Sequence, residues 1–144
     1  MKKIVILKGN IIHTPDPHAF QCVKNGYLVA EDNEIQGIYQ NLPKEYEGKP
    51  VTDWGDALIM PGMYDMHVHA PQYVYRGLGL DMQLMDWLNT YAFPTEARFK
   101  DPEYAKVYYR AFARALKKNG TARAVIFSTI HGNTTELLMD ILEE

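Results

Sequence analysis

Two histidines separated by one residue are the side chains in this sequence best suited to bind a metal ion. They lie in Asp65-Met66-His67-Val68-His69, which we expect to form a β-strand. Alternate side chains of a strand share a face, so His67 and His69 point the same way, about 7 Å apart along the backbone. Neutral imidazole nitrogens suit zinc or iron. The spacing predicts that both imidazoles converge on one ion.

Further ligands for such a site are not evident from the sequence pattern. A catalytic zinc site needs about three protein ligands and an open position for water. His13 and His18 lie in an earlier, β-rich part of the chain. His131 follows a later strand, and we interpret it as a loop or cap residue. Glu96 and Asp81 could act as acids or bases, but capping roles account for both.

Other catalytic chemistries find little support in the sequence. It contains no Gly-x-Ser-x-Gly motif and no phosphate-binding glycine loop. Cys22 is its single cysteine, which excludes an internal disulfide framework and a multi-cysteine zinc site. We interpret Cys22 as a small buried residue rather than a nucleophile. A single thiol fits a reducing, cytoplasmic location best.

The composition is that of an ordinary globular protein. Of 144 residues, 47% are hydrophobic and 23% are charged, and the net charge is −3. These values exclude a disordered polar tail and a basic nucleic-acid binder, so we expect no nucleic-acid partner. No apolar run approaches the ~20 residues of a membrane span, so we expect no membrane contact. The apolar stretch after Lys3 is too short for a signal peptide.

The residues before about position 60 predict short strands joined by turns. Gly9-Asn10 lies between two β-rich runs and predicts a hairpin turn. Asp32-Asn33 predicts a second turn of this kind. Gly37 indicates a bulge in the strand that follows. Residues 40–56 are rich in Pro, Gly, Glu and Lys, and they predict a loop.

The residues after position 60 predict a strand followed by helices. The strand covers residues 64–69, and a first helix would be capped by Asp81 and stopped by Pro94. A second helix would begin at Asp101-Pro102, since an acidic cap followed by proline favours a helix start. Its apolar residues recur at three and four positions until Asn119-Gly120 ends it.

The last part of the chain predicts one more strand and one more helix. Residues 124–130 are β-rich and uncharged, which is typical of a strand buried on both faces of a parallel sheet. Asn133 or Thr134 would cap the final helix. The order strand, helix, helix, strand, helix indicates an α/β fold with parallel strands. Because Glu143-Glu144 is a poor helix end, we expect the chain to stop in the middle of a fold.

Several segments resemble a known family. Residues 60–69, Met-Pro-Gly-Met-Tyr-Asp-Met-His-Val-His, resemble the first-strand signature of the amidohydrolase superfamily. Further segments narrow the resemblance to the guanine deaminase family: Ala70-Pro71-Gln72-Tyr73, Leu84-Met85-Asp86-Trp87-Leu88, Tyr91-Ala92-Phe93-Pro94-Thr95-Glu96, Lys118-Asn119-Gly120-Thr121 and Ser128-Thr129-Ile130-His131. The resemblance covers almost the whole chain.

The resemblance implies a small β-sandwich that carries a (β/α)8 TIM barrel. Residues 1–58 would be the amino-terminal part of the sandwich, and residues 59–144 the first two barrel strands with their helices. A barrel needs about 250 residues. The chain is therefore expected to be an amino-terminal part with an incomplete barrel.

The resemblance also implies roles for five residues. His67 and His69 match two metal ligands, Gln72 matches a residue that hydrogen-bonds the purine, and Leu84 and Trp87 match residues near the pocket. The metal would be zinc, with iron as an alternative. The family hydrolyses guanine to xanthine and ammonia in the cytoplasm, and its members are expected to form homodimers. Its remaining metal ligands and its acid–base residue have no counterpart here, so no catalytic residue is assigned within the chain.

Three readings stay open at this point. In the first, the chain is part of a guanine deaminase and is inactive as 144 residues alone. In the second, the enzyme class is the same but the substrate is another aminopurine or a triazine. In the third, the chain is a non-catalytic, truncated remnant. One departure from the family is Ala122-Arg123, which stands where further threonines are usual and places a charge at the start of a strand.

Overall fold

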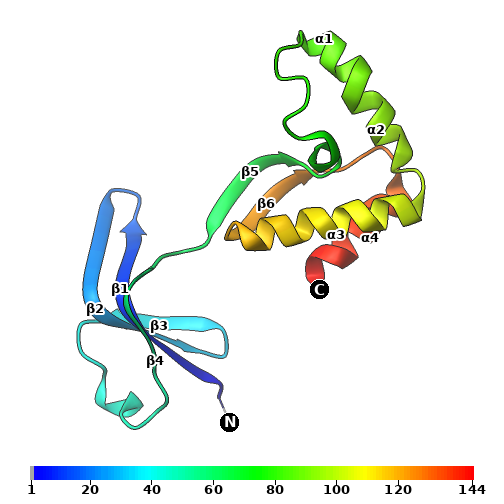
Figure 1. Cartoon of the computed structure of the whole chain (residues 1–144). Helices are drawn as coiled ribbons and strands as arrows, with labels where there is room; N and C mark the ends of the chain where they lie inside the picture. Colours follow the sequence, from blue (N-terminus) through cyan, green and yellow to red (C-terminus); the bar gives the residue numbers. More distant parts are fainter. Residues whose placement is uncertain (1) are drawn as a thin grey trace. The chain divides into compact units, whose positions relative to one another are not determined.

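The structure is a computed structural model that describes residues 2–144. It divides between Pro61 and Gly62 into two units, each with its own sheet. The elements of the first unit are β1 (Ile4–Asp16), β2 (Ala19–Glu31), β3 (Glu34–Tyr39), the 3-10 helix Lys44–Tyr46 and β4 (Thr52–Ile59). Those of the second unit are β5 (Met63–His69), the 3-10 helix Pro71–Tyr75, α1 (Leu84–Trp87), the π-helical turn Leu88–Ala92, α2 (Phe93–Arg98), α3 (Pro102–Lys118), β6 (Thr121–Phe127) and α4 (Gly132–Glu143) (Figure 1).

The first unit is a single sheet with the strand order β3-β2-β1-β4. β1 pairs with β2 in antiparallel and with β4 in parallel direction. Ile6, Val29 and Tyr46 form its buried core. The Tyr46 hydroxyl donates a hydrogen bond to Glu31 Oε1 at 3.1 Å, which connects the 3-10 helix to the end of β2.

β1 runs through Gly9-Asn10 without a break, so the predicted hairpin turn at this pair is wrong. The side-chain amide of Asn10 donates to the Asp56 carbonyl at 3.0 Å and accepts from the Asn25 N–H at 3.1 Å. Asn10 thereby links both neighbouring strands where the pairing shifts register, and the pair marks a bulge instead of a turn. The hairpin turn lies further on, at residues 17–18.

The second predicted hairpin turn is confirmed. Asp32 and Asn33 have φ values of 48° and 72°, the left-handed backbone that a two-residue hairpin turn requires. The bulge near Gly37 is also confirmed, because the pairing of β2 with β3 shifts register between Val29 and Ala30, opposite Gly37.

The predicted loop over residues 40–56 is too long, since β4 begins at Thr52. The missing signal is long-range: β4 is mostly exposed and is ordered by pairing with β1, where Lys8 Nζ lies 2.8 Å from Asp53 Oδ2. Cys22 is exposed, so its interpretation as a buried residue is wrong. None of the helices in residues 2–144 has the length and apolar character needed to cross a bilayer.

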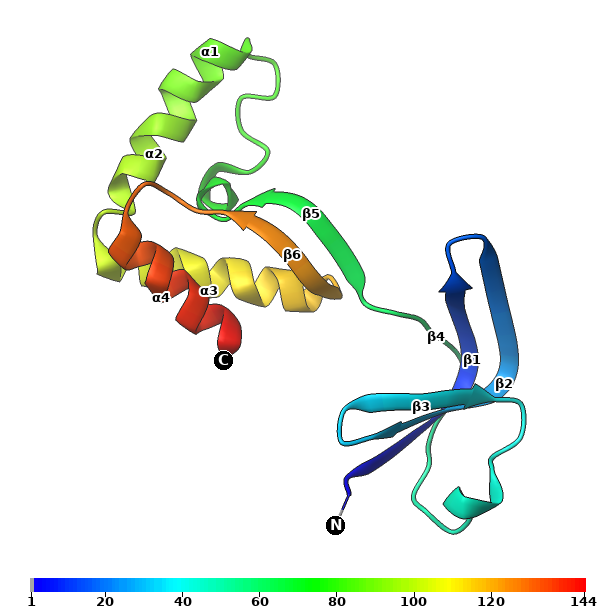
Figure 2. The ribbon, with the colours of Figure 1, turned by 180° about the vertical axis from the view of Figure 1, so that it is seen from behind.

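The second unit is a parallel pair of strands with helices on one face. β5 and β6 pair in parallel, and α3 and α4 lie together on the same side of the pair (Figure 2). Val68 and Ile126 point toward a core that includes Phe99, Tyr109 and Leu138. The opposite face of β6 is open, with Phe127 46% exposed. The expectation that this strand is buried on both faces is therefore not met in residues 2–144.

The predicted α3 is confirmed in detail. The Asp101 side chain accepts a hydrogen bond from the Glu103 N–H at 3.0 Å, and Pro102 occupies the first turn. Lys117 and Lys118 lie in the last turn, where they complement the negative end of the helix dipole. Gly120 follows with φ +73°, as expected for a left-handed stop.

The helical segment before α3 departs from its prediction at both ends. Asp81 is not the cap, because the helix begins at Leu84 with Gln83 at the cap position and no side-chain cap bond. Pro94 does not stop the helix, which continues to Arg98. The Phe93 N–H donates to the Leu88 carbonyl five residues back, and this π-helical turn places Pro94 in the first turn of α2, where no N–H donor is needed.

Two smaller features complete this unit. The last helix begins at Gly132 with His131 at the cap position, so neither Asn133 nor Thr134 is its cap. Thr134 is buried and donates to the His131 carbonyl at 3.2 Å. Gly62 precedes β5 at a close approach of the two strands, where an added Cβ would collide with the Cβ of Ala122.

Candidate functional site

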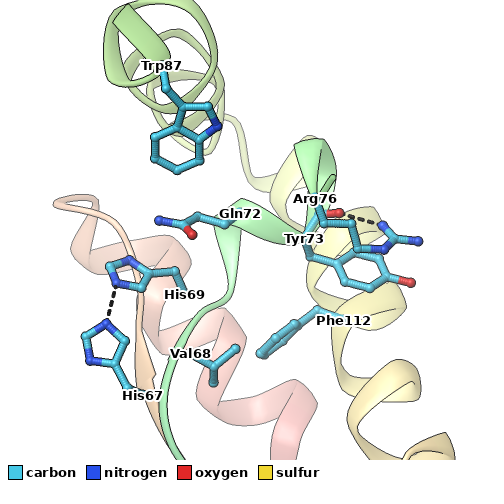
Figure 3. Close-up of a pocket in the computed structure, with 8 residues that line it drawn as sticks. All are labelled: His67, Val68, His69, Gln72, Tyr73, Arg76, Trp87 and Phe112. Atoms are coloured by element: carbon cyan, nitrogen blue, oxygen red, sulfur yellow. Dashed lines mark hydrogen bonds between the residues drawn. The ribbon is translucent and has the colours of Figure 1, made fainter. Parts of the chain in front are cut away.

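His67 and His69 project from the same face of β5, as their spacing predicts. Their Nε2 atoms lie 3.3 Å apart (Figure 3). The two imidazole rings are tilted by 55° with centroids 5.2 Å apart, so they turn their nitrogens toward each other without stacking. β5 therefore delivers two nitrogen donors to one point at its carboxyl end.

Phe127 packs against both imidazole rings, and Asp65 contacts the backbone of His67. The Phe127 ring stacks on His69 with centroids 4.7 Å apart and planes 13° apart, and it lies 4.8 Å from the ring of His67. The Asp65 carboxylate accepts a hydrogen bond from the backbone N–H of His67 at 3.2 Å, which fixes the main chain at this residue. The sequence analysis missed Phe127, although the parallel pairing that sets Phe127 beside His69 is the signal that finds it.

The spacing of the two nitrogens fits a shared metal ion. Two nitrogens about 2.0–2.1 Å from a tetrahedral zinc ion are about 3.3–3.4 Å apart, which matches the observed separation. Residues 2–144 contain no group of three or more His, Cys, Asp or Glu side chains arranged to hold a metal. His67 and His69 alone would supply two ligands, and a catalytic zinc site needs about three.

A cavity of about 460 Å³ opens beside the histidines. Gln72 reaches it from the 3-10 helix that follows β5, and Trp87 reaches it from α1. Figure 3 shows the Gln72 carboxamide between the indole of Trp87 and the imidazole of His69. The remaining lining residues are Val68, Tyr73, Arg76 and Phe112. An amide that both donates and accepts, set between an indole and an imidazole, can hydrogen-bond the edge of a planar heterocycle.

Not every residue singled out in the sequence reaches this cavity. Leu84 is 68% exposed and does not line it. His131 lies at the start of α4, while His13 and His18 belong to the first unit. The structure therefore gathers His67, His69, Gln72 and Trp87 and leaves the other candidates outside.

Two titratable groups outside the cavity lining, Glu96 and Tyr75, have raised pKa values. Burial raises the pKa of the Glu96 carboxyl, and the positive charge of His69 opposes part of that rise. Burial, together with the charge of Glu96, raises the pKa of Tyr75 to about 12. Because of this high pKa the Tyr75 hydroxyl stays protonated, and it has no hydrogen-bond partner within residues 2–144. Sequence spacing did not single out Tyr75, and Glu96, which we interpreted as a capping residue, lies within α2 and is not its cap.

Known proteins are similar in sequence to this chain. Guanine deaminase from Rattus norvegicus is 33% identical over 97% of this chain and 33% of that protein. A probable guanine deaminase from Schizosaccharomyces pombe is 42% identical over 94% of this chain and 28% of that protein. The chain thus spans about a third of the length of these curated relatives.

A solved structure is similar to this chain as well. The crystal structure of guanine deaminase from C. acetobutylicum, with guanine bound in its active site, superposes with a TM-score of 0.92 and 41% identity over 97% of this chain and 33% of that one. The sequence pattern described as "Amidohydrolase family" matches residues 58–144, a range that contains the two histidines, Gln72 and Trp87. The chain belongs to the amidohydrolase family.

Proposed function

We propose that this chain is the amino-terminal part of a zinc-dependent guanine deaminase, which hydrolyses guanine to xanthine and ammonia. The main support is that His67 Nε2 and His69 Nε2 lie 3.3 Å apart, beside the carboxamide of Gln72 in one cavity. The guanine deaminase relatives and the guanine-bound structure, similar over 94–97% of the chain, support the choice of substrate.

Residues 1–58 would then be part of a small β-sandwich, and residues 59–144 would begin a (β/α)8 barrel. The parallel β5–β6 pair with α3 and α4 on one face supports this reading of the second unit. In such barrels, sites are built at the carboxyl ends of the strands, where His69 and Gln72 lie. Further metal ligands and the acid–base group would come from residues outside 1–144.

Each residue of the cavity has a distinct task in this proposal. His67 and His69 would hold the zinc ion, which when bound supplies Lewis-acid activation of water. Phe127 packs against both imidazole rings, and Asp65 fixes the backbone of His67 by accepting from its main-chain N–H. Gln72 would donate to and accept from the purine edge, and an uncharged amide selects for hydrogen-bonding pattern without requiring a charged ligand. Trp87 bounds the cavity above Gln72.

An activity assay tests this proposal directly. A complete enzyme that contains this chain should convert guanine to xanthine and ammonia when loaded with zinc, and a chelator should abolish the turnover. Adenine and a chlorotriazine assayed in parallel test the alternative substrates. Turnover of either in preference to guanine would overturn the assignment of substrate.

The isolated residues 1–144 should show no guanine turnover even with added zinc. The physical reason is that a catalytic zinc site needs about three protein ligands, while this chain brings two together. The purified chain is assayed beside its His67→Ala variant. Turnover above that control would contradict the proposal that the remaining machinery lies elsewhere.

A further inference from the structure

The polar group of Trp87 is already engaged within the protein. Its indole Nε1–H donates to the carbonyl oxygen of Leu78 at 3.1 Å. An indole has only this one donor and no acceptor. The part of the ring that Figure 3 shows directed toward Gln72 is therefore carbon. Trp87 offers the cavity a flat, apolar surface and leaves polar contacts to Gln72.

Gly79 is packed directly against the indole. Its φ is +67°, and a Cβ added there would lie 3.0 Å from Trp87 Cδ1, 2.7 Å from Tyr91 Cε2 and 2.9 Å from Met82 Sδ. Both the left-handed backbone and the lack of space require glycine. Gly77, two residues earlier, has φ +80°, but an added Cβ there would meet nothing within 4 Å.

Tyr75 supports the indole from another side. Only 3% of Tyr75 is exposed, and its ring meets that of Trp87 edge-on with centroids 5.5 Å apart. The same ring stacks on Tyr91 with centroids 6.3 Å apart. Trp87 is thus fixed by a hydrogen bond, by a backbone that approaches closely and by an aromatic neighbour, while one side faces the cavity.

We infer that Leu78 and Gly79, in the loop that precedes α1, position Trp87 as a carbon wall against which a planar purine ring is recognised by shape. The inference rests on the proposed function for the identity of the ligand. Gly79 and the Leu78 carbonyl are positioning residues, because they act on the ligand through the indole. Beside the indole, Gln72 supplies the polar group that contacts the edge of the base.

The two glycines of this loop provide a matched test in the complete enzyme. Gly79→Ala and Gly77→Ala impose a similar backbone strain, but only Gly79→Ala adds a collision with the indole. The protein is labelled with 5-fluorotryptophan, and the ¹⁹F resonance lost in Trp87→Phe identifies Trp87. Gly79→Ala should shift this resonance and raise KM for guanine about 10- to 100-fold, since a misplacement of about 1 Å can cost about 100-fold. Gly77→Ala should do neither, and zinc content should be equal in both.

A second pair of variants keeps the test valid if Gly79→Ala fails to fold. Trp87→Phe retains a flat ring without the N–H, whereas Trp87→Ala removes the ring. The carbon wall predicts a clearly smaller rise of KM for Trp87→Phe than for Trp87→Ala. Equal rises for this pair, or equal ¹⁹F shifts for the two glycine variants, would overturn the inference. An unsubstituted enzyme without guanine turnover would count against the proposed function alone, since the ¹⁹F comparison needs no ligand.

Discussion

α3 and the helical segment from Leu84 to Arg98 follow each other in the chain but differ in how they are built. α3 has a side-chain cap at Asp101, a proline in its first turn and lysines in its last. The earlier segment has no side-chain cap, a π-helical turn and a proline in its middle. α3 packs on the strands as a support, while the irregular segment brings Trp87 to the cavity. In this unit the regular helix supports the strands, and the irregular helical segment contributes to the site.

The largest effect is expected where α3 is buried. Tyr109 is 0% exposed, its ring lies 4.8 Å from that of Phe99, and its hydroxyl lies 3.1 Å from Ser128 Oγ. Tyr109→Ala should lower the free energy of unfolding by about 3–5 kcal/mol, as for other large aromatic truncations. Urea unfolding followed by circular dichroism measures it. Val107→Ala, at a 63% exposed position of the same helix, should change it by less than about 0.5 kcal/mol. Similar losses for both would mean that α3 is not a packed support.

Substitutions of the β5 histidines should weaken metal binding and leave the free energy of unfolding nearly unchanged, in contrast to the substitution in α3. His67→Ala or His69→Ala removes a ligand and should weaken zinc binding by more than about 100-fold, since losing a partner one shell further out already costs about 10- to 100-fold. His67 is exposed, so the free energy of unfolding without metal should change little. Zinc titration of a complete enzyme measures the affinity. His131→Ala is the control. A comparable loss of zinc affinity in this variant would show that the assignment of His67 and His69 as the ligands is wrong.

Gln72 tests whether the cavity separates base recognition from metal binding. Gln72→Ala removes one neutral hydrogen-bonding group, which costs about 1–3 kcal/mol, or roughly 5- to 150-fold in kcat/KM. The zinc content should stay that of the unsubstituted enzyme. Steady-state kinetics beside metal analysis makes the comparison. Loss of zinc, or full activity on guanine, would refute the assigned role.

The smallest expected effect compares the starts of the two helices. Asp101→Ala removes the bond to the Glu103 N–H and should lower the free energy of unfolding by about 0.5–2 kcal/mol. Gln83→Ala at the start of α1 removes no cap bond and should change it by less than about 0.5 kcal/mol. Equal losses in urea unfolding would erase the distinction between the capped and the uncapped helix.

The same distinction explains which features could be predicted from the sequence. α3 was predictable because its signals are local: the Asp101-Pro102 start, the apolar spacing and the Gly120 stop. Pro94 misled because a π-helical turn removes the need for its N–H. Gly9-Asn10 misled because the Asn10 amide bonds two other strands and turns the pair into a bulge.

The candidate site divides in a similar way. The pairing of His67 with His69 follows from strand geometry alone, so spacing sufficed to predict it. Phe127, Tyr75 and Gly79 act through contacts between segments that the sequence does not place side by side. Leu84, which the family resemblance assigned to the pocket, lies outside the cavity lined by residues 2–144.

The close approach of Gly62 to Ala122 restricts how this sequence can evolve. As long as residue 122 carries a Cβ, residue 62 must lack one, so the two positions cannot vary independently. The residue at one position limits which residues fit at the other, although both lie at the opposite end of the strands from the imidazoles. A methyl group added at position 62 would push apart the strands that carry His69 and Phe127. Substitutions far from the cavity are therefore selected through their effect on it.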